Sequence, residues 1–264
     1  MLARVTLLPE VPAVRLVVYN IRYATGSGAR FHLPFPGAGY LRNDRRILQR
    51  LTDFLRQQNA DVVGLLEVDT GSWRTRLVNQ AQHLADALGH YSIYQCKYGT
   101  ASVNQLLPVL RKQSNAFLAA PRVHGERFHY FESGIKRLVI ELELDDVCIF
   151  LVHLSLKYRH RQFQLRHLHD LVMQAGKPVI VAGDFNTFWG THELFLFQQA
   201  TRLRSANAAG LLTFPSDAPK HELDFVLVSP QIEVTGFSVP DIRLSDHRPL
   251  VCDFIVNRKE TAHD

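Results

Sequence analysis

The sequence has few cysteines and no long apolar run. Its three cysteines, Cys96, Cys148 and Cys252, are an odd set without a CxxC spacing, so we expect neither a disulfide framework nor a cysteine zinc site. Nowhere do about 18 uncharged apolar residues follow one another, and Glu10 and two prolines interrupt the apolar start. These absences predict a cytoplasmic protein without a signal peptide or membrane span.

Several catalytic motifs are also missing. The sequence contains no GxSxG, HExxH, GxxxxGK or EF-hand loop, which removes the usual esterase, zincin, nucleotide triphosphatase and calcium-sensor interpretations. The run 166–170 (RHLHD) imitates a metallohydrolase HxHxD, but it lies in a stretch with helical periodicity, where residues two apart point to different sides. We therefore interpret it as a polar helix face.

What is present fits one globular domain. The 264 residues are 46% hydrophobic and 21% charged, with a mean hydropathy of -0.07, which is enough to build a sizeable core. No linker or repeat divides the chain, so we predict a single domain over 1–264 with its core at about 14–256. Lys and Arg outnumber Asp and Glu by 30 to 25, and the pI is near 9.2. This balance favours an anionic partner such as nucleic acid, a phosphate ester or a lipid headgroup.

Hydrophobic periodicity predicts alternating strands and helices. Strands are expected at 14–19, 61–66, 137–144, 147–153, 178–182, 223–228 and 250–256, and helices at 43–58, 73–88 and 160–174. Asn43 and Ser72 are the predicted N-caps, and Gly89 and Gly176 the predicted C-caps. The acidic pair 145–146 between two strands predicts a hairpin. We infer packed α/β layers with mixed sheets.

Polar side chains stand where many of these strands begin or end. They are Asn20, Glu67, His153, Asp184, Asn186, Ser245, Asp246 and His247. Strand ends are where α/β folds assemble their sites. Taken singly, each residue is also explained as a turn residue, a solvated strand end or a partly buried histidine. Only the set as a whole favours a site.

The motifs that contain these residues follow one another in a specific order. They are VVYNIR, GLLEVD, FLVHLS, VAGDFNT, LDFVLVS and LSDHRPL. Together they resemble the endonuclease/exonuclease/phosphatase superfamily, which includes deoxyribonuclease I, apurinic endonucleases, neutral sphingomyelinases and inositol polyphosphate 5-phosphatases. The resemblance covers roughly Arg15 to Ile255. It implies an α/β fold, a four-layer α/β sandwich with two mixed β-sheets packed face to face and helices outside, and a catalytic domain for phosphoester hydrolysis.

The resemblance further implies a metal site formed by Asn20 and Glu67, with Asp246 close by. Elementary chemistry supports such a site, because a phosphodiester repels nucleophiles with its own charge and a hard cation neutralises that charge. Mg²⁺ prefers one or two carboxylates plus waters, and Glu67 and Asp246 supply the carboxylates. We therefore expect Mg²⁺ as the cofactor, with Mn²⁺ as a substitute.

Five residues match the catalytic positions of the superfamily. By the resemblance, Asp184 is the general base, alone or together with His247, and Asn186 holds the scissile phosphate. Asp224 matches the position that orients the final histidine, and a carboxylate there raises the pKa of that imidazole and fixes its tautomer. His153 matches the histidine of the deoxyribonuclease, sphingomyelinase and phosphatase branches.

Basic residues predicted to contact the substrate lie in the segment 22–46 and in the run 157–161. They are Arg22, Arg42, Arg45, Arg46, Lys157 and Arg159. Such segments can grip phosphates and, through interleaved aromatic residues, stack bases. A solvated loop and a solvated helix start explain the two segments nearly as well. Apurinic endonucleases carry aspartate in place of Arg22 and tyrosine in place of His153, which counts against abasic-site repair.

These observations support three functional hypotheses. The first is a Mg²⁺-dependent phosphodiesterase that acts on nucleic acid. The second keeps the chemistry but takes a phospholipid or phosphoinositide headgroup, since Phe31, Leu33, Phe35 and Leu41 can form a shallow interfacial patch for peripheral lipid contact. The third, a catalytically silent binding module, is disfavoured because no expected acid, amide or histidine is missing. The sequence leaves the oligomeric state and the choice between endo and exo action open.

Overall fold

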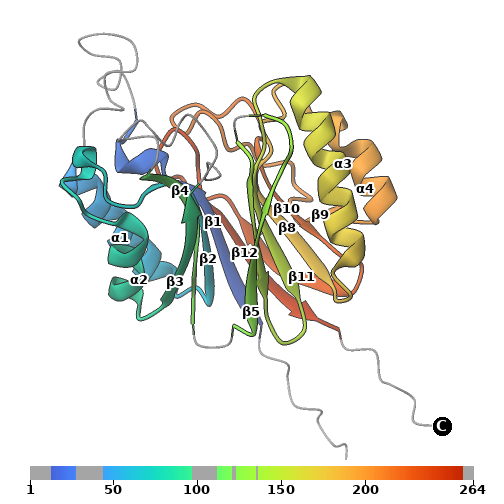
Figure 1. The fold of residues 1–264 in the computed structure, drawn as a ribbon, viewed down its shortest axis with the longest axis horizontal. Helices are drawn as coiled ribbons and strands as arrows, with labels where there is room; N and C mark the ends of the chain where they lie inside the picture. The colour runs from blue at the N-terminus through green and yellow to red at the C-terminus, as the bar shows by residue number, and fades with distance from the viewer. Residues whose placement is uncertain (1–12, 28–43, 97–111, 121–122, 135, 258–264) are drawn as a thin grey trace, which may run out of the picture.

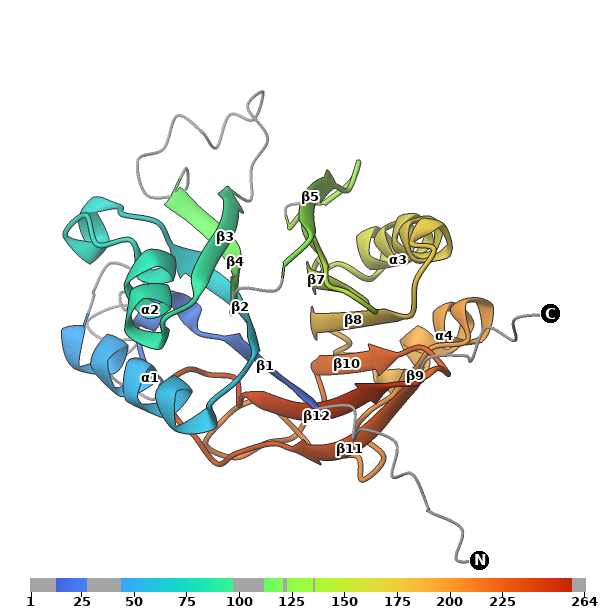
Figure 2. The ribbon, with the colours of Figure 1, turned by 90° about the horizontal axis from the view of Figure 1, so that it is seen from below.

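Two mixed sheets form the centre of the structure. The computed structural model describes residues 13–27, 44–96, 112–120, 123–134 and 136–257. Within them, two six-stranded sheets pack face to face, and a pair of helices covers the outer face of each sheet (Figure 1, Figure 2). The predicted four-layer α/β sandwich is therefore confirmed.

The first sheet contains the first and the last strand of the described chain. Its order is β11 (Ile232–Ser238), β12 (Leu250–Val256), β1 (Val14–Asn20), β2 (Val62–Asp69), β4 (Gln113–Ala119) and β3 (Tyr91–Cys96). Only β1 and β2 are parallel neighbours in it. Helices α1 (Arg45–Gln58) and α2 (Gln80–Leu88) pack on its outer face.

The second sheet comes from the middle of the chain. Its order is β5 (Gly125–Tyr130), β6 (Leu138–Glu143), β7 (Cys148–His153), β8 (Val179–Asp184), β10 (Asp224–Val228) and β9 (Arg204–Ser205). Here β7 and β8 are the parallel pair. Helices α3 (Tyr158–Gln174) and α4 (Phe195–Thr201) cover the outer face, on the opposite side of the molecule from α1 and α2 (Figure 1).

The central strands are buried on both faces. In β1, Leu16 and Val18 point into the core between the sheets, whereas Val17 and Tyr19 point toward the helices α1 and α2. Because successive side chains of a strand alternate between its faces, a strand covered on both sides is a continuous apolar run. This is why the sequence signals the central strands so clearly.

The predicted strands are all present, as β1, β2, β6, β7, β8, β10 and β12, and residues 145–146 form the predicted turn between β6 and β7. The sequence did not reveal β3, β4, β5, β9, β11 or the helix α4. Gly89 ends α2 with a φ of 70°, as predicted, and Gly176, with a φ of 67°, follows the C-cap Ala175 of α3. The side chain of Asp44 caps α1, and the predicted cap Asn43 lies outside the described residues.

The prediction of one continuous helix over 73–88 was wrong, because a short 3-10 helix covers Trp73–Thr75 and α2 follows only after residues 76–79. Helix α2 begins at Gln80 and is capped by Asn79, not by Ser72. The reason is the buried carboxylate of Asp69, which accepts hydrogen bonds from Ser72 N at 2.7 Å and from Ser72 Oγ at 2.6 Å. Ser72 therefore stands at the N-cap position of the short 3-10 helix, but its hydroxyl binds Asp69 and caps no helix.

Candidate active site

The predicted catalytic residues gather at one edge of the two sheets. Asn20, His153 and Asp184 end β1, β7 and β8, Glu67 lies near the end of β2, and Asp224 begins β10. Two parallel neighbouring strands end at the same edge of a sheet, and a strand antiparallel to them begins at that edge. In the second sheet, Asp184 is therefore paired with His153 on one side and with Asp224 on the other.

The carboxylate of Asp184 makes the central contacts of the site. Its Oδ2 accepts a hydrogen bond from Asn20 Nδ2 at 3.2 Å. The same oxygen lies 3.0 Å from Nε2 of His153 and 3.8 Å from Nε2 of His247. Burial acts to raise the pKa of the Asp184 carboxyl, but the positive charges of His247 and His153 outweigh it and hold that pKa well below its usual range. Asp184 is therefore ionised at neutral pH.

His247 lies between two carboxylates. Its Nδ1 is 2.8 Å from Oδ2 of Asp224, and the ring of Phe214 packs against it with 4.9 Å between ring centroids. Burial acts to lower the pKa of His247, but the charges of Asp224 and Asp184 prevail and raise it to about 10. Burial raises the pKa of Asp224 itself, against the charge of His247. The imidazole is therefore protonated at neutral pH.

Asn186 is held against Asp184 by the backbone after β8. Its N–H donates to Asp184 Oδ1 at 2.9 Å, its Nδ2 donates to the carbonyl of Leu154 at 2.8 Å, and its φ is 52°. Just before it, Gly183 has a φ of 143°, and a Cβ there would lie 1.9 Å from the carbonyl oxygen of Val152. The GDFN motif therefore needs glycine for a close approach between strands as well as its polar residues for chemistry.

Glu67 is aimed into the site by a bulge in β2. The register with β4 shifts between Leu65 and Val68, and Glu67 adopts a φ of 55°, which is uncommon for a residue with a side chain. Its Oε1 lies 4.0 Å from Nε2 of His153 and 3.8 Å from Nζ of Lys136. A strained backbone at a carboxylate of this kind is typical of functional positions.

Asp246 and Arg22 meet at the edge of the site. Arg22 Nε lies 3.3 Å from Asp246 Oδ2, and the Arg22 N–H donates to Asn20 Oδ1 at 3.2 Å. The sequence suggested a substrate contact for Arg22 and a place near the metal for Asp246. The structure connects the two side chains to each other and, through Asn20, to Asp184.

Among the described residues, two groups offer ligands for a metal ion. Asp184, Asp224 and His247 have ligand atoms that all lie within 4.8 Å of one another. The second group is the predicted one, with the Glu67 carboxylate and the Asn20 amide as donors. Both ring nitrogens of His247 face carboxylates, and its pKa is raised, so both nitrogens are protonated. A protonated imidazole has no free lone pair for a metal ion, which disfavours His247 as a ligand.

The other predicted substrate residues lie farther out. Arg45 and Arg46 are exposed on the first turn of α1, while Arg42 lies outside the described residues, as does the apolar patch 31–41. Lys157 and Arg159 are exposed where α3 begins, shortly after the end of β7. The structure therefore brings Arg22 into the site and connects none of the other predicted substrate residues that it describes to the site.

Sequence reasoning did not single out Arg161 and Lys136. Arg161 belongs to the basic run 157–161, yet it is fully buried, donates to Glu193 Oε2 at 2.9 Å, and binds the carbonyls of Ser155 and Leu156. These hydrogen bonds hold the connection between β7 and α3 against the start of the helix. Lys136 stands just before β6, which pairs antiparallel with β7, so a basic residue at that position is placed beside His153. The antiparallel pairing of these two strands is the feature that could have indicated Lys136 from the sequence.

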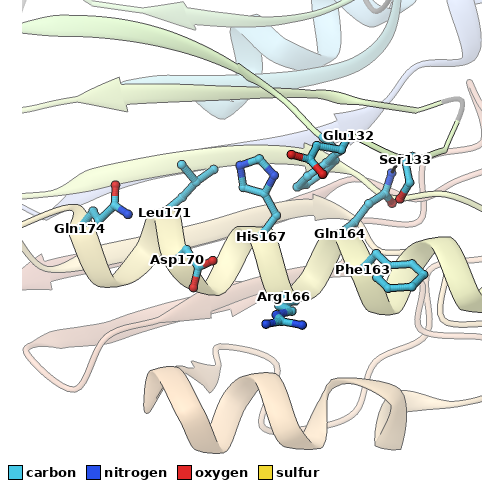
Figure 3. Close-up of a pocket in the computed structure, with 10 residues that line it drawn as sticks. Glu132, Ser133, Phe163, Gln164, Arg166, His167, Asp170, Leu171 and Gln174 are labelled. Atoms are coloured by element: carbon cyan, nitrogen blue, oxygen red, sulfur yellow. Dashed lines mark hydrogen bonds between the residues drawn. The ribbon is translucent and has the colours of Figure 1, made fainter.

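A cavity of about 680 Å³ lies along α3, and none of the predicted catalytic residues lines it. It is lined by Phe131, Glu132, Ser133, Phe163, Gln164, Arg166, His167, Asp170, Leu171 and Gln174 (Figure 3). The HxHxD-like run is helical, as predicted. Part of it borders this cavity, and the ring of His167 packs edge-on against Phe131.

Comparison with known families decides the classification. The model described as Endonuclease/Exonuclease/phosphatase family matches residues 18–247. The chain belongs to the endonuclease/exonuclease/phosphatase family. Among its relatives, the uncharacterized protein YbhP of Escherichia coli K12 is 28% identical over 233 residues, which cover 79% of this chain and 88% of that protein.

Several solved structures share the fold of this chain. An endonuclease/exonuclease/phosphatase family protein from Bacteroides thetaiotaomicron has a TM-score of 0.72 at 14% identity, with 94% of this chain and 100% of that chain covered. A mannosyl-6-phosphatase from the same species has a TM-score of 0.71 at 13% identity, with 92% and 99% covered. The human Nocturnin catalytic domain with bound sulfate has a TM-score of 0.66 at 19% identity, with 93% and 95% covered.

Proposed function

We propose that this chain is a metal-dependent phosphodiesterase that hydrolyses nucleic acid. The observation that carries the proposal is the set of contacts around Asp184, where an ionised carboxylate lies within reach of Asn20, His153 and His247 at the edge that also presents Glu67. Membership of a family of phosphoesterases supports the reaction class, and the excess of basic over acidic residues supports an anionic substrate.

Glu67 would be the principal metal ligand, with Asn20 and Asp246 beside it. Their carboxylate and amide oxygens suit Mg²⁺ or Mn²⁺, and the ammonium of Lys136 next to Glu67 indicates that this place accommodates positive charge. A bound ion supplies neutralisation of the phosphate charge and eases deprotonation of the attacking water.

The protein's own groups would perform the remaining chemistry. Asp184 accepts the proton of the attacking water, because it is ionised and buried among donors that orient it. Protonated His247, held by Asp224, donates a hydrogen bond to the phosphoryl oxygens as negative charge develops on them. The amide of Asn186, beside Asp184, holds the same group in place.

The proposal is tested with purified protein in Mg²⁺, Mn²⁺ or EDTA, offered supercoiled plasmid, single-stranded DNA, RNA, sphingomyelin and inositol phosphates. We expect plasmid or RNA cleavage that needs the divalent ion. Asp184→Asn is isosteric and should lower the rate by about 10² to 10⁴, the worth of proton abstraction. Absence of cleavage of every substrate with either ion would support the silent binding module instead.

A lipid phosphoester is the second candidate, because exposed apolar side chains follow the catalytic strands. Leu156 is 61% exposed and Tyr158 51% exposed after β7, and Trp189 is 73% exposed after β8. Side chains of this kind can enter a bilayer interface. In the described part of the chain, no helix is long and apolar enough to cross a membrane. Headgroup release without plasmid nicking would select this alternative over the nuclease.

We also propose that residues 1–264 act as one catalytic domain in the cytoplasm. Cys148 and Cys252 are free and buried, and burial raises the pKa of their thiols to about 11 and about 12. Such thiols are poorly reactive and need no partner, which agrees with a reducing compartment.

A further inference from the structure

We propose that Lys136 is a further catalytic residue, whose ammonium group contacts the phosphoryl oxygens of the substrate. The inference rests on the proposed phosphoester hydrolysis and adds a residue that motif matching does not mark. It is carried by the place of Lys136 beside Glu67 and His153, and by a set of hydrogen bonds that fixes the segment before β6.

The ammonium of Lys136 lies within the site. Its Nζ contacts Nε2 of His153 and is 3.8 Å from Oε1 of Glu67, and 22% of the side chain is exposed. It is also close enough to Asp184 to contribute to the lowered pKa of that carboxyl. A partly exposed cation among these groups is reachable by a substrate and positioned at the same time.

His153 cannot satisfy both groups that face its Nε2. This nitrogen lies 3.0 Å from Asp184 Oδ2 and also contacts the ammonium of Lys136. It carries either a hydrogen, which suits the carboxylate, or a lone pair, which suits the ammonium. Because ionised Asp184 favours the hydrogen, the ammonium gains by turning from His153 to another acceptor, and a phosphoryl oxygen is a strong one.

Gln164 of α3 fixes the segment that carries Lys136. Its Nε2 donates to the carbonyl of Lys136 at 2.7 Å and to that of Ser133 at 3.0 Å. Its Oε1 accepts from the N–H of Ser155, two residues after His153, at 2.8 Å. One buried amide therefore joins the segment before β6 to the end of β7, and Figure 3 shows Gln164 and Ser133 side by side.

Gly134 lets this segment approach β7 closely. Its φ is 94°, and a Cβ there would lie 2.3 Å from Ser155 Oγ and 2.8 Å from Gln164 Nε2. Both the backbone conformation and the space therefore require glycine. The contacts of Gly134 and Gln164 therefore fix the backbone of this segment, as an accurately placed Lys136 side chain requires.

In the reaction, Lys136 keeps its proton. Water attacks phosphorus, the bond to the leaving oxygen breaks, and the ammonium donates hydrogen bonds to the non-bridging oxygens as their charge grows. The competing explanation is that Lys136 only balances the charge of Glu67 and Asp184 when no metal is bound. A mere counterion would affect metal affinity but not turnover at saturating metal.

The two explanations differ in the kinetics of Lys136→Met and Lys136→Arg on bis(p-nitrophenyl) phosphate at saturating Mg²⁺. We expect Lys136→Met to lower kcat by about 10²-fold, the scale for losing one such donor, and Lys136→Arg to recover part of the loss. Lys177→Met removes a lysine that is paired with Glu143 away from the site and should leave kcat unchanged. An unchanged kcat in Lys136→Met, with only tighter Mg²⁺ binding, would overturn the proposal.

Gln164 gives a second test as a positioning residue. Gln164→Leu should lower kcat in the wild-type background but have little further effect in Lys136→Met, because residues that act through one another are not additive. Full additivity would show that Gln164 acts only on stability and would remove the positioning argument.

Calorimetry with inorganic phosphate and Mg²⁺ separates this proposal from the proposed function. If the wild type binds phosphate but hydrolyses no phosphoester, the proposed function fails, and Lys136 is upheld only if Lys136→Met weakens phosphate binding about tenfold or more. Equal phosphate binding by wild type and Lys136→Met would reject the Lys136 contact even in an active enzyme. A wild type that neither binds nor hydrolyses rejects both.

Discussion

Replacing Asp224 by asparagine should shift the titration of His247. Asp224 is the main source of the positive shift that places the pKa of His247 at about 10, against an ordinary value of 6.5. An adjacent opposite charge contributes about 2 units, so the variant should titrate near pH 8, since Asp184 still acts in the same direction. At pH 9, His247 would then be about 90% protonated in the wild type and about 10% in the variant.

Histidine ring signals in NMR spectra, recorded in EDTA from pH 5 to 11, measure this shift directly. Stability supplies a second readout, because the folded state holds the proton more tightly than the unfolded chain. The contribution of His247 to the free energy of unfolding is fully present below about pH 6.5 and is lost as the pH rises toward 10. Urea denaturation of the wild type should show this loss, and the loss should come at lower pH in Asp224→Asn.

Asp241→Asn is the matched control. Asp241 pairs with Arg243 and Arg248 and makes no contact with His247 among the hydrogen bonds and ion pairs of the described residues. This variant should leave the titration of His247 unchanged. A wild-type His247 that titrates near pH 6.5, or a variant that titrates with the wild type, would refute the electrostatic reasoning.

Three further predictions concern the metal, the backbone and the surface. Metal at a hundredfold excess over its dissociation constant should stabilise the wild type by about 2.7 kcal/mol, and Glu67→Gln should abolish most of this gain in thermal melts; an unchanged gain would move the ion to the Asp184 group. Gly183→Ala should prevent normal folding, seen by circular dichroism, because its Cβ would lie 1.9 Å from Val152 O; a native-like melt would contradict the packing. Neutralising exposed Arg45 and Arg46 together should flatten the salt dependence of DNA binding in fluorescence anisotropy while turnover at saturation changes much less; an unchanged slope would remove them from the substrate surface.

Buried strands other than β4 could be predicted from sequence, whereas the edge strands could not. β7 and β8 are apolar throughout because both faces are covered, and their ends at His153 and Asp184 were visible in the pattern. β5 and β11 lie at sheet edges and are partly exposed, so their sequences carry polar residues and no clear alternation. The residues of the predicted site meet because the strand order brings the polar ends of β1, β2, β7, β8 and β10 to one edge. The sequence pattern showed where these strands end but did not predict their order.

Contacts that depend on burial or strand register were missed for physical reasons. The charge of Arg161 suggested that its side chain lies at the surface, because the sequence does not show that Glu193 is its buried partner. Ser72 suggested a helix cap because it directly precedes the helix-period stretch 73–88, but the carboxylate of Asp69 accepts the hydrogen bond of its hydroxyl. The ion pair of Arg22 with Asp246 joins residues more than 200 positions apart and has no local signal.

The place of β1 between β2 and β12 has a consequence for biosynthesis. The second sheet is complete once β10 has left the ribosome, but β1 keeps an unpaired edge until β12, the last described strand, emerges. Long-range pairing of this kind is slow and leaves strand edges open to aggregation. Asn20 and His247, which both face Oδ2 of Asp184, likewise come together only after the segment that carries His247 has been synthesised.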